Sequence, residues 1–314
     1  MSIKKINIKT IPSPKTVIWG EGKENKKEIP KIIWFFWDSP TYSPTVALCI
    51  NRLKELNPGF EINIIDFKTI NNFLPDFNRN NLKNLHIVNI TDLIRLELVY
   101  RYGGIYLDAS VFLIDNLDWV IETQKKNSCD FIGFYTERYM SNADFPMVES
   151  WFFAASPENK FMKEWLQEYK NIIFHKTPDY LYEDIDTDVY SKLPDPGYLK
   201  IYVSAAIVMR KSSDYILNLI KSEDGAHFYN VNYLHTKPSV MQNVMLLSKI
   251  PDKLPQLIKL TNAGRLACDM YIEKGLYKFD SILFKLSRED FPNKHLLRLK
   301  RLMRFSLKYL SKKK

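Results

Sequence analysis

The stretch YRYGGIYLDASVFL, residues 100–113, places one acid, Asp108, inside an apolar run that follows two glycines. Apolar residues at helical spacing predict a helix over 89–104, which the glycines end. The apolar run itself predicts a strand over 105–114. A carboxylate in such a strand loses much of its hydration, so it needs a cation or hydrogen-bond donors to stay charged.

The sequence around Asp108 favours a bound metal ion as that cation. No basic residue lies within 105–114 to pair with the carboxylate. Mg²⁺ and Mn²⁺ prefer hard oxygen ligands, and a diphosphate can supply some of them. One carboxylate, a diphosphate and water would form a workable metal site. The alternative is an acid that only caps a turn at the end of a strand.

Asp92 and Arg95 lie three residues apart on the predicted helix, so they share one of its faces. Thr91 or Asp92 is expected to cap this helix. Arginine offers several fixed donors and aspartate accepts two hydroxyls, so the pair would suit a sugar held in a cleft above the sheet. The alternative is a surface ion pair worth only tenths of a kcal/mol.

Strand-like and helix-like runs alternate over the first half of the chain, which favours an α/β fold. Residues 201–222 predict a strand followed by a helix. The remaining strands are predicted over 29–37, 60–66, 130–135 and 149–156, and helices over 45–59 and 157–174.

The composition describes a folded protein of 314 residues with 46% hydrophobic residues, enough for one large core or two modest lobes. The three cysteines are far apart and show no paired spacing, which indicates a reducing compartment. Neither a signal peptide nor an apolar run of about 20 residues that could span a bilayer is visible. We therefore expect a cytosolic protein.

The net charge of +9 comes from residues 294–314, which hold nine basic residues and no acid. The rest of the chain is neutral, which argues against a nucleic-acid-binding surface. At about 100° per residue, most apolar residues of this tail fall on one half of a helix and most bases on the other. That pattern is typical of a helix lying on an anionic membrane. The alternative is a terminal helix docked on the body of the protein.

Three segments together resemble a known family: IPKIIWFFW (29–37), TDLIRLELVYRYGGIYLDAS (91–110) and ESWFFAAS (149–156). They are similar to the D-x-D glycosyltransferases of the GT-A fold. More narrowly, they resemble glycosyltransferase family 32, in the branch that contains bacterial capsular polysaccharide synthesis proteins. The resemblance covers about residues 29–160. It implies a nucleotide-sugar donor, a divalent metal (Mn²⁺ or Mg²⁺) and retention of the anomeric configuration.

The resemblance also implies roles by position for residues of the donor site. Trp37 would stack on the uracil ring, or instead continue the buried run that precedes it. Asp38 would contact the ribose or the donor sugar. Asp92 and Arg95 would hold the donor sugar, and Asp108 would bind the ribose or the metal.

Ser110 stands where the family pattern has its second aspartate, and a hydroxyl is a neutral and weaker metal ligand. His235 could complete the metal site, with Asn232 and Gln242 as alternatives. Lys237 could neutralise the diphosphate.

Glu149 and Ser150 would lie near the transferred sugar, according to the same resemblance. Glu149 could bind sugar hydroxyls or stabilise an oxocarbenium-like transition state. The alternative for Glu149 is a charge that only ends a strand.

The expected fold is therefore α/β and GT-A-like, a Rossmann-like mixed sheet flanked by helices, with a helical C-terminal extension. The expected catalytic domain spans 1–290, with the donor-binding half at 29–160 and the acceptor side and insertions at 161–290. The basic amphipathic helix would span 291–314.

The expected function is transfer of a hexose from a UDP-sugar to an undecaprenyl-diphosphate-linked saccharide in capsule synthesis, at the cytoplasmic face of the cell membrane. UDP-galactose is favoured over UDP-glucose as the donor. One alternative is a UDP-glucose-dependent glucosyltransferase, and another is a sugar-binding or membrane-docking protein without catalysis. A metal-dependent phosphohydrolase that uses Asp108 would need further clustered ligands, which the sequence does not show.

Overall fold

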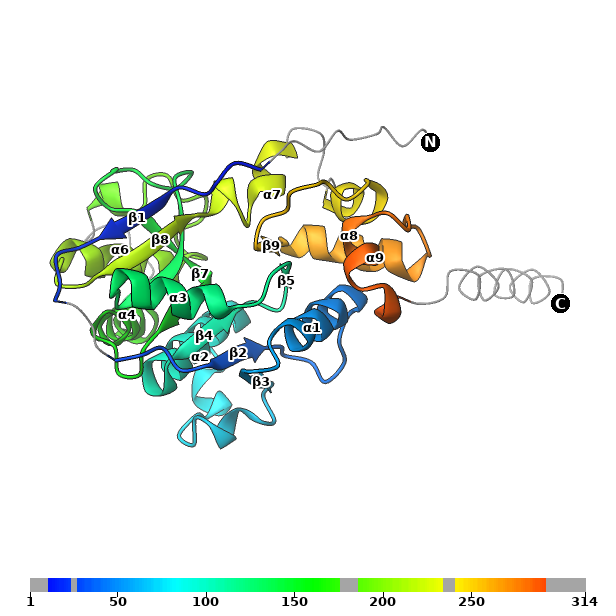
Figure 1. Cartoon of the computed structure of the whole chain (residues 1–314). Helices are drawn as coiled ribbons and strands as arrows, with labels where there is room; N and C mark the ends of the chain where they lie inside the picture. The colour runs from blue at the N-terminus through cyan, green and yellow to red at the C-terminus, as the bar shows by residue number, and fades with distance from the viewer. Residues whose placement is uncertain (1–10, 24–26, 176–185, 234–240, 292–314) are drawn as a thin grey trace.

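The computed structural model describes residues 11–23, 27–175, 186–233 and 241–291, built around a seven-stranded mixed sheet (Figure 1). Its strands are β1 (Thr16–Trp19), β2 (Ile32–Phe36), β3 (Glu61–Ile65), β4 (Gly104–Leu107), β6 (Phe131–Thr136), β7 (Met147–Ala155) and β8 (Leu217–Lys221). The strand order is β1-β8-β6-β7-β4-β2-β3. β2 is parallel to β3 and β4, β6 is parallel to β8, and β7 is antiparallel to β4 and β6. The expected mixed α/β sheet flanked by helices is thereby confirmed.

The helices cover both faces of this sheet. The α-helices among the described residues are α1 (Pro44–Leu56), α2 (Ile87–Tyr102), α3 (Asp118–Asn127), α4 (Lys160–Lys170), α6 (Lys200–Lys211), α7 (Phe228–Tyr233), α8 (Asn262–Glu273) and α9 (Ile282–Leu286), of which α1, α2, α3, α4 and α6 pack against the sheet. Side chains of α2, α4 and α6 share one hydrophobic core with the sheet, while those of α1 and α3 share a second. The sheet is therefore buried between two helical layers.

A two-stranded antiparallel sheet, β5 (Val111–Leu113) and β9 (Leu257–Lys259), joins the main sheet to the C-terminal part of the fold. Here a third hydrophobic core forms from α1, β5, α7, α8 and α9. Figure 1 shows α8 and α9 on the side of α1 that faces away from the main sheet. Residues that are distant in sequence are thereby brought next to the end of β4.

The helix predicted over 89–104 is present, but it begins earlier than expected. α2 starts at Ile87, and the ring nitrogen Nδ1 of His86 accepts a hydrogen bond from the Val88 amide at 3.3 Å. The expectation that Thr91 or Asp92 caps this helix is therefore wrong, because both lie inside it. The ring of His86 takes the place of the oxygen acceptor that the sequence pattern favoured.

The single strand predicted over 105–114 is in fact two strands that belong to different sheets. β4 ends at Leu107, and β5 begins only at Val111. Between them the Val111 amide donates to the Asp108 carbonyl at 3.0 Å, which closes a tight turn. Asp108 therefore follows the carboxyl end of β4 and is not enclosed in the middle of a strand.

The order predicted for residues 201–222, a strand followed by a helix, is wrong. The segment Lys200–Lys211 forms α6, and the strand β8 follows at Leu217. α6 buries almost all of its side chains against its neighbours. A helix that is apolar on all sides lacks the spacing that distinguishes it from a buried strand.

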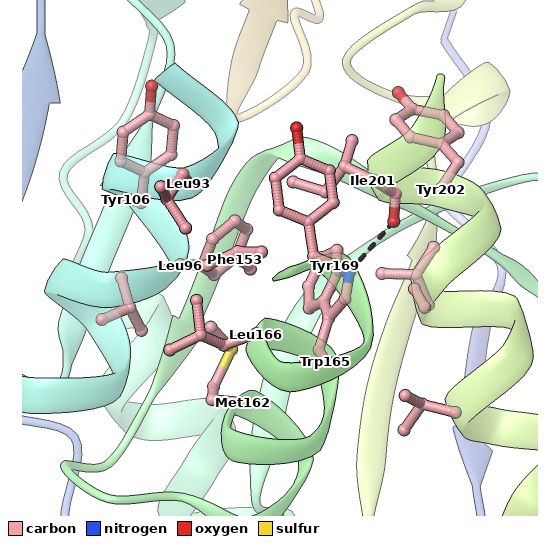
Figure 2. Close-up of a cluster of buried hydrophobic side chains, with 14 of the residues drawn as sticks. Leu93, Leu96, Tyr106, Phe153, Met162, Trp165, Leu166, Tyr169, Ile201 and Tyr202 are labelled. Carbon is pink, nitrogen blue, oxygen red and sulfur yellow. Dashed lines mark hydrogen bonds between the residues drawn. The ribbon is translucent and has the colours of Figure 1, made fainter. Parts of the chain in front are cut away.

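The core between α2, α4, α6 and the sheet is rich in aromatic side chains (Figure 2). Trp165 of α4 donates its indole N–H to the Ile201 carbonyl of α6 at 2.9 Å. Figure 2 shows the phenol oxygens of Tyr106, Tyr169 and Tyr202 at the same end of this cluster. The cluster is thus apolar at its base and polar at the end that approaches Asp108.

The two glycines that join α2 to β4 allow a backbone conformation and a close contact that a side chain would prevent. Gly104 has a φ of +94°, and a Cβ there would lie 2.5 Å from the Ile32 carbonyl oxygen of β2. Gly104→Ala is expected to lower the free energy of unfolding by about 1–3 kcal/mol. Urea unfolding measures this, with Gly59→Ala as the control because no heavy atom lies within 4 Å of a Cβ there. Equal stability of the two variants would contradict the argument.

The state of the cysteines and the presence of a membrane-spanning helix can also be compared with the expectations from the sequence. Cys49, Cys129 and Cys268 are buried free thiols, and the reducing compartment inferred from their spacing stays a prediction. Within the described residues, no helix is long and apolar enough to span a bilayer. The basic helix expected over 291–314 lies outside the described residues except for Phe291.

Candidate functional site

A polar hollow of about 410 Å³ opens at the edge of the sheet where β2 and β4 end. The carboxyl ends of parallel strands meet at one edge of a sheet, which is where α/β proteins bind ligands. Trp37 and Asp38 follow β2 there, and Asp108 and Ser110 follow β4. Arg95 contributes to the lining from α2. The structure thus brings together five of the residues expected at the donor site.

Asp108 is held by three neighbours that engage both of its carboxylate oxygens. Its Oδ1 lies 3.2 Å from Nη2 of Arg95 and accepts from the Tyr106 hydroxyl at 3.3 Å. Its Oδ2 accepts from Nζ of Lys259 at 2.8 Å. Burial alone would raise the pKa of Asp108, but Lys259 and Arg95 hold it below its ordinary value. Asp108 is therefore a charged group in this site.

Two protein side chains, Arg95 and Lys259, supply the positive charge beside Asp108 that the sequence reasoning assigned to a metal ion. The guanidinium of Arg95 also donates to the Ser150 carbonyl at 2.8 Å and stands over the Tyr106 ring at 4.7 Å. Its Nη2 lies 3.4 Å from Oδ1 of Asp92. Arg95 is thus a rigid bridge between two aspartates, not a surface ion pair.

Asp92 lies buried behind Arg95, beneath the lining of the hollow. Burial raises its pKa to about 6, and the charge of Arg95 offsets part of that effect. Ser150, which was expected near the transferred sugar, is also buried and has its hydroxyl 3.3 Å from Nη1 of Arg95. Both residues therefore position Arg95 in this structure.

Trp37 and Asp38 form the rim of the hollow. Trp37 is partly buried, and its indole N–H donates to the Thr41 carbonyl at 3.0 Å. The guanidinium of Arg265, from α8, stands 5.2 Å from the Trp37 ring. Arg265 is itself held by Asp269 at 3.1 Å. An aromatic ring and a cation that lie side by side suit a ligand with a flat base and phosphates.

Lys259 and Arg265 are functional candidates that the sequence reasoning missed. Both come from the C-terminal part of the chain, where no motif marks them. A lysine inside the apolar run PQLIKL, at 255–260, is the one signal that could have drawn attention to Lys259. Its partner could not be found from sequence, since Asp108 is 151 residues away.

Glu149 does not share this hollow with Asp108, although both were expected beside the donor sugar. It lies at the wall of a second cavity of about 200 Å³ that His227, Tyr229 and Glu223 also line. Its Oε2 and the hydroxyl of Tyr229 are buried and lack a hydrogen-bond partner among the described residues. The two spaces lie close together, because Asn230, which lines the second cavity, donates to the carbonyl of Lys259, which lines the first.

The tautomer of His227 follows from its contacts. The side-chain amide of Asn230 donates to the Lys259 carbonyl at 2.8 Å, and the same nitrogen lies 3.0 Å from Nδ1 of His227. Because that nitrogen can only donate, Nδ1 must accept, and the ring proton is on Nε2. Nε2 faces Oε1 of Glu149 at 3.6 Å. The cavity thus presents one donor and one acceptor side by side.

Glu149 should make the stability of the protein depend on pH. Burial raises its pKa to about 7 from an ordinary value of 4.5, while Ser222 and Trp151 offset part of the shift. The folded state therefore holds this proton more tightly, and the free energy of unfolding should fall as the pH rises from about 4.5 to about 7. The fall should amount to roughly 1–3 kcal/mol.

The comparison of wild type with Glu149→Gln isolates this effect. Burial, with Lys259 and Arg138, lowers the pKa of His227 to about 3, so its ring stays neutral across that pH range. Urea unfolding at a series of pH values is expected to show the fall in wild type and a weaker dependence in the variant. Parallel curves for the two proteins would contradict the prediction.

The residues expected to complete a metal site or, in the case of Lys237, to neutralise the diphosphate fall into two groups. His235 and Lys237 lie outside the described residues. Asn232 donates to the Phe228 carbonyl within α7 at 3.0 Å. Gln242 is buried, with Oε1 unpartnered among the described residues.

The described residues do not fit a divalent ion. The oxygens of Asp108 and Ser110 that would bind it both contact Nζ of Lys259, at 2.8 and 2.6 Å. In the part of the chain that the structure covers, no group of three or more His, Cys, Asp or Glu residues could hold a metal. The metal inferred from the family resemblance stays a prediction.

A mixed sheet flanked by helices, with a charged hollow where its parallel strands end, defines a ligand-binding α/β protein and agrees with the expected GT-A-like fold. A family model described as "capsular polysaccharide synthesis protein" matches residues 16–191, more than half of the chain. The chain belongs to this family. The narrower resemblance to glycosyltransferase family 32 stays a prediction.

Two curated relatives have recognisable sequence similarity. O-glycosyltransferase braB of Annulohypoxylon truncatum is 25% identical over 246 residues, which cover 69% of this chain and 56% of that protein. Glycosyltransferase afumC of Aspergillus fumigatus is 28% identical over 103 residues, which cover 27% of this chain and 26% of that protein. The chain therefore spans about half the length of the first relative and about a quarter of the second.

Solved structures of glycosyltransferases are similar at low sequence identity. GlyE of Streptococcus pneumoniae is 12% identical with a TM-score of 0.43, over 88% of this chain and 64% of that chain. The galactosyltransferase LgtC in complex with donor and acceptor sugar analogues is 17% identical with a TM-score of 0.29, over 45% of this chain and 66% of that chain. At this level the similarity concerns the fold alone.

Proposed function

We propose that the chain is a retaining glycosyltransferase of capsular polysaccharide synthesis that moves a hexose from a UDP-sugar to an undecaprenyl-diphosphate-linked saccharide. The observation that carries this proposal is the network in which the buried Asp92 and Arg95 contact the half-buried Asp108 at the hollow where β2 and β4 end. Family membership and the glycosyltransferase names of both relatives support it.

The donor would lie along the hollow with its sugar toward Arg95 and Asp108. These two side chains offer fixed donors and an acceptor to sugar hydroxyls. Trp37 would stack on the uracil, with Arg265 close to the phosphates. Galactose is favoured over glucose as the transferred hexose. The two sugars differ in the orientation of one hydroxyl, which a few side chains of the hollow would distinguish.

The acceptor saccharide would enter through the cavity beside Glu149. Asn230 of this cavity donates to the carbonyl of Lys259 in the donor hollow, and Oε2 of Glu149 and the hydroxyl of Tyr229 suit sugar hydroxyls. In the reaction the bond from the sugar C1 to the phosphate oxygen breaks, and its electron pair leaves with UDP. An acceptor hydroxyl forms the new bond and loses its proton. We assign no general base.

Release of UDP tests the proposal directly. Purified protein is incubated with UDP-galactose, UDP-glucose or UDP-N-acetylglucosamine and a lipid-linked saccharide, and UDP is measured by a coupled assay. We expect release that depends on the acceptor and is fastest with UDP-galactose. Sugar binding without UDP release from any of these donors would refute the enzyme and favour a sugar-binding protein.

Membrane association is proposed from the basic tail, residues 294–314, which lies outside the described residues. A lipid-linked acceptor lies at the cytoplasmic face of the membrane, so an enzyme bound there would be close to this substrate. The full chain should float with anionic liposomes, and a chain that ends at residue 293 should bind them much more weakly. Equal flotation of both chains would remove this part of the proposal.

A further inference from the structure

Lys259 occupies the point between Asp108 and Ser110 at which a metal ion would have to bind. Its ammonium nitrogen lies 2.8 Å from Oδ2 of Asp108 and 2.6 Å from Oγ of Ser110. These are strong, direct hydrogen bonds, the first of them between two charged groups. A divalent ion at this place would need the same two oxygens.

The backbone on both sides holds Lys259 at this position. In the β5–β9 pair, Val111 lies opposite Lys259, and the next residue, Leu260, donates its amide to the Ser110 carbonyl at 2.9 Å. On its other edge, Lys259 donates its own amide to the Ala226 carbonyl at 3.0 Å. The backbone of Lys259 is therefore fixed on β9, which pairs with β5, the strand that follows Asp108.

The charges of this arrangement balance as they would in a two-carboxylate metal site. Two aspartates and a divalent cation sum to zero, and so do one aspartate, one serine and one lysine. Ser110 is neutral where a second aspartate would carry a negative charge. This loss of one negative charge balances the lower charge of an ammonium, which is +1 where a divalent metal ion has +2. Asp108 and Ser110 suit a monovalent cation better than a divalent one.

The ammonium can also reach a ligand in the hollow. Lysine has three N–H donors, and Asp108 and Ser110 take two of them. Among the described residues the third has no hydrogen-bond acceptor, and Lys259 lines the same hollow as Trp37 and Arg265. An ammonium is a compact charge that binds phosphate oxygens well.

We propose that the ammonium of Lys259 takes the place of a divalent metal ion and binds the diphosphate of the donor, so that UDP binding needs no metal. The proposal rests on the proposed function, because it concerns the donor of that reaction. Lys259 of β9 would then neutralise the diphosphate, which was expected of Lys237 and a metal ion.

Calorimetric titration of UDP into the full chain tests this without relying on turnover. Wild type is expected to bind UDP in EDTA and in Mn²⁺ with affinities that agree within about threefold. Lys259→Met should weaken binding in EDTA by about 10- to 100-fold, the usual effect of losing a hydrogen bond to a charged group. Thermal unfolding establishes that the variant is folded.

Two further variants sharpen the test. Lys221→Met is the matched control: Lys221 is also a largely buried strand lysine, 2.5 Å from Glu137, but it lies away from the hollow. It should bind UDP as wild type does. The double variant Ser110→Asp with Lys259→Ala restores a second carboxylate and removes the ammonium. Its UDP affinity should now rise by about tenfold or more when Mn²⁺ replaces EDTA.

The outcomes separate this inference from the proposed function. Wild type that binds UDP only with Mn²⁺ would overturn the role of Lys259 and leave the donor class standing. Lys259→Met that binds UDP in EDTA as well as wild type would also overturn it. Wild type without UDP affinity in either buffer would refute the UDP-sugar donor itself.

Discussion

Asp108→Asn is expected to reduce turnover of the UDP-sugar by about 10²–10³-fold, the usual cost of removing one fixed electrostatic group from a site. The carboxylate holds Lys259 at 2.8 Å and Arg95 at 3.2 Å. An amide of the same shape cannot balance two cations, and its NH₂ group would point at one of them. Both side chains that face the donor should therefore shift or bind counter-ions.

The measurement is acceptor-dependent UDP release, with far-UV circular dichroism to establish the fold. Asp118→Asn is the matched control because Asp118 pairs with Lys31 on the surface at 2.7 Å. Such a pair is worth only about 0–1 kcal/mol, so this variant should keep nearly full activity. Full turnover in Asp108→Asn would remove Asp108 from the catalytic site.

Arg95→Met is expected to lower the free energy of unfolding by about 3–5 kcal/mol, as removal of one partner from a buried ion pair does. Arg95 is 7% exposed and lies between Asp92 and Asp108. Methionine fills much of the same volume but leaves Asp92 without its cation. The variant should also lose donor binding, because Arg95 lines the hollow.

Arg101→Met on the same helix provides the control for this prediction. Arg101 is more exposed and pairs with Glu97 at 3.0 Å, four residues earlier in α2. Its loss should cost about 0.3–0.5 kcal/mol. Urea unfolding at pH 7 measures both variants. A loss of less than about 1 kcal/mol in Arg95→Met would show that the buried network does not stabilise the fold.

Most elements of the fold could be predicted because their signals are local. Helical spacing and the two glycines identified α2 and its end, and apolar runs identified β2, β3, β6 and β7. The errors have local causes too. The run at 105–114 is apolar except for Asp108 and Ser110, and these two residues were interpreted as part of one strand, so the turn between β4 and β5 was missed. α6 is buried on nearly every side, so its spacing could not separate helix from strand.

The candidate site could be predicted only in part. Asp92 and Arg95 were recognisable because a spacing of three residues puts them on one helix face. Asp108 was recognisable as the single acid inside an apolar run, and Trp37 through the resemblance of the run 29–37 to the family's donor site. The sequence could not predict that Glu149 lies outside the hollow that contains Asp108. Neighbouring residues of β7 face different sides of the sheet, and the pairing of β6 with β7 has an irregular register between Gly133 and Tyr135, opposite this part of β7.

The sequence by itself determined that Asp108 needs a cation or hydrogen-bond donors, because a carboxylate within an apolar run loses much of its hydration. It also determined that a helix, two glycines and a strand come before it. Only the tertiary structure decided which cation stands there. Lys259 reaches Asp108 through the pairing of β5 with β9, a contact between distant segments. No local pattern records such a contact, since it depends on how the packed elements align in space.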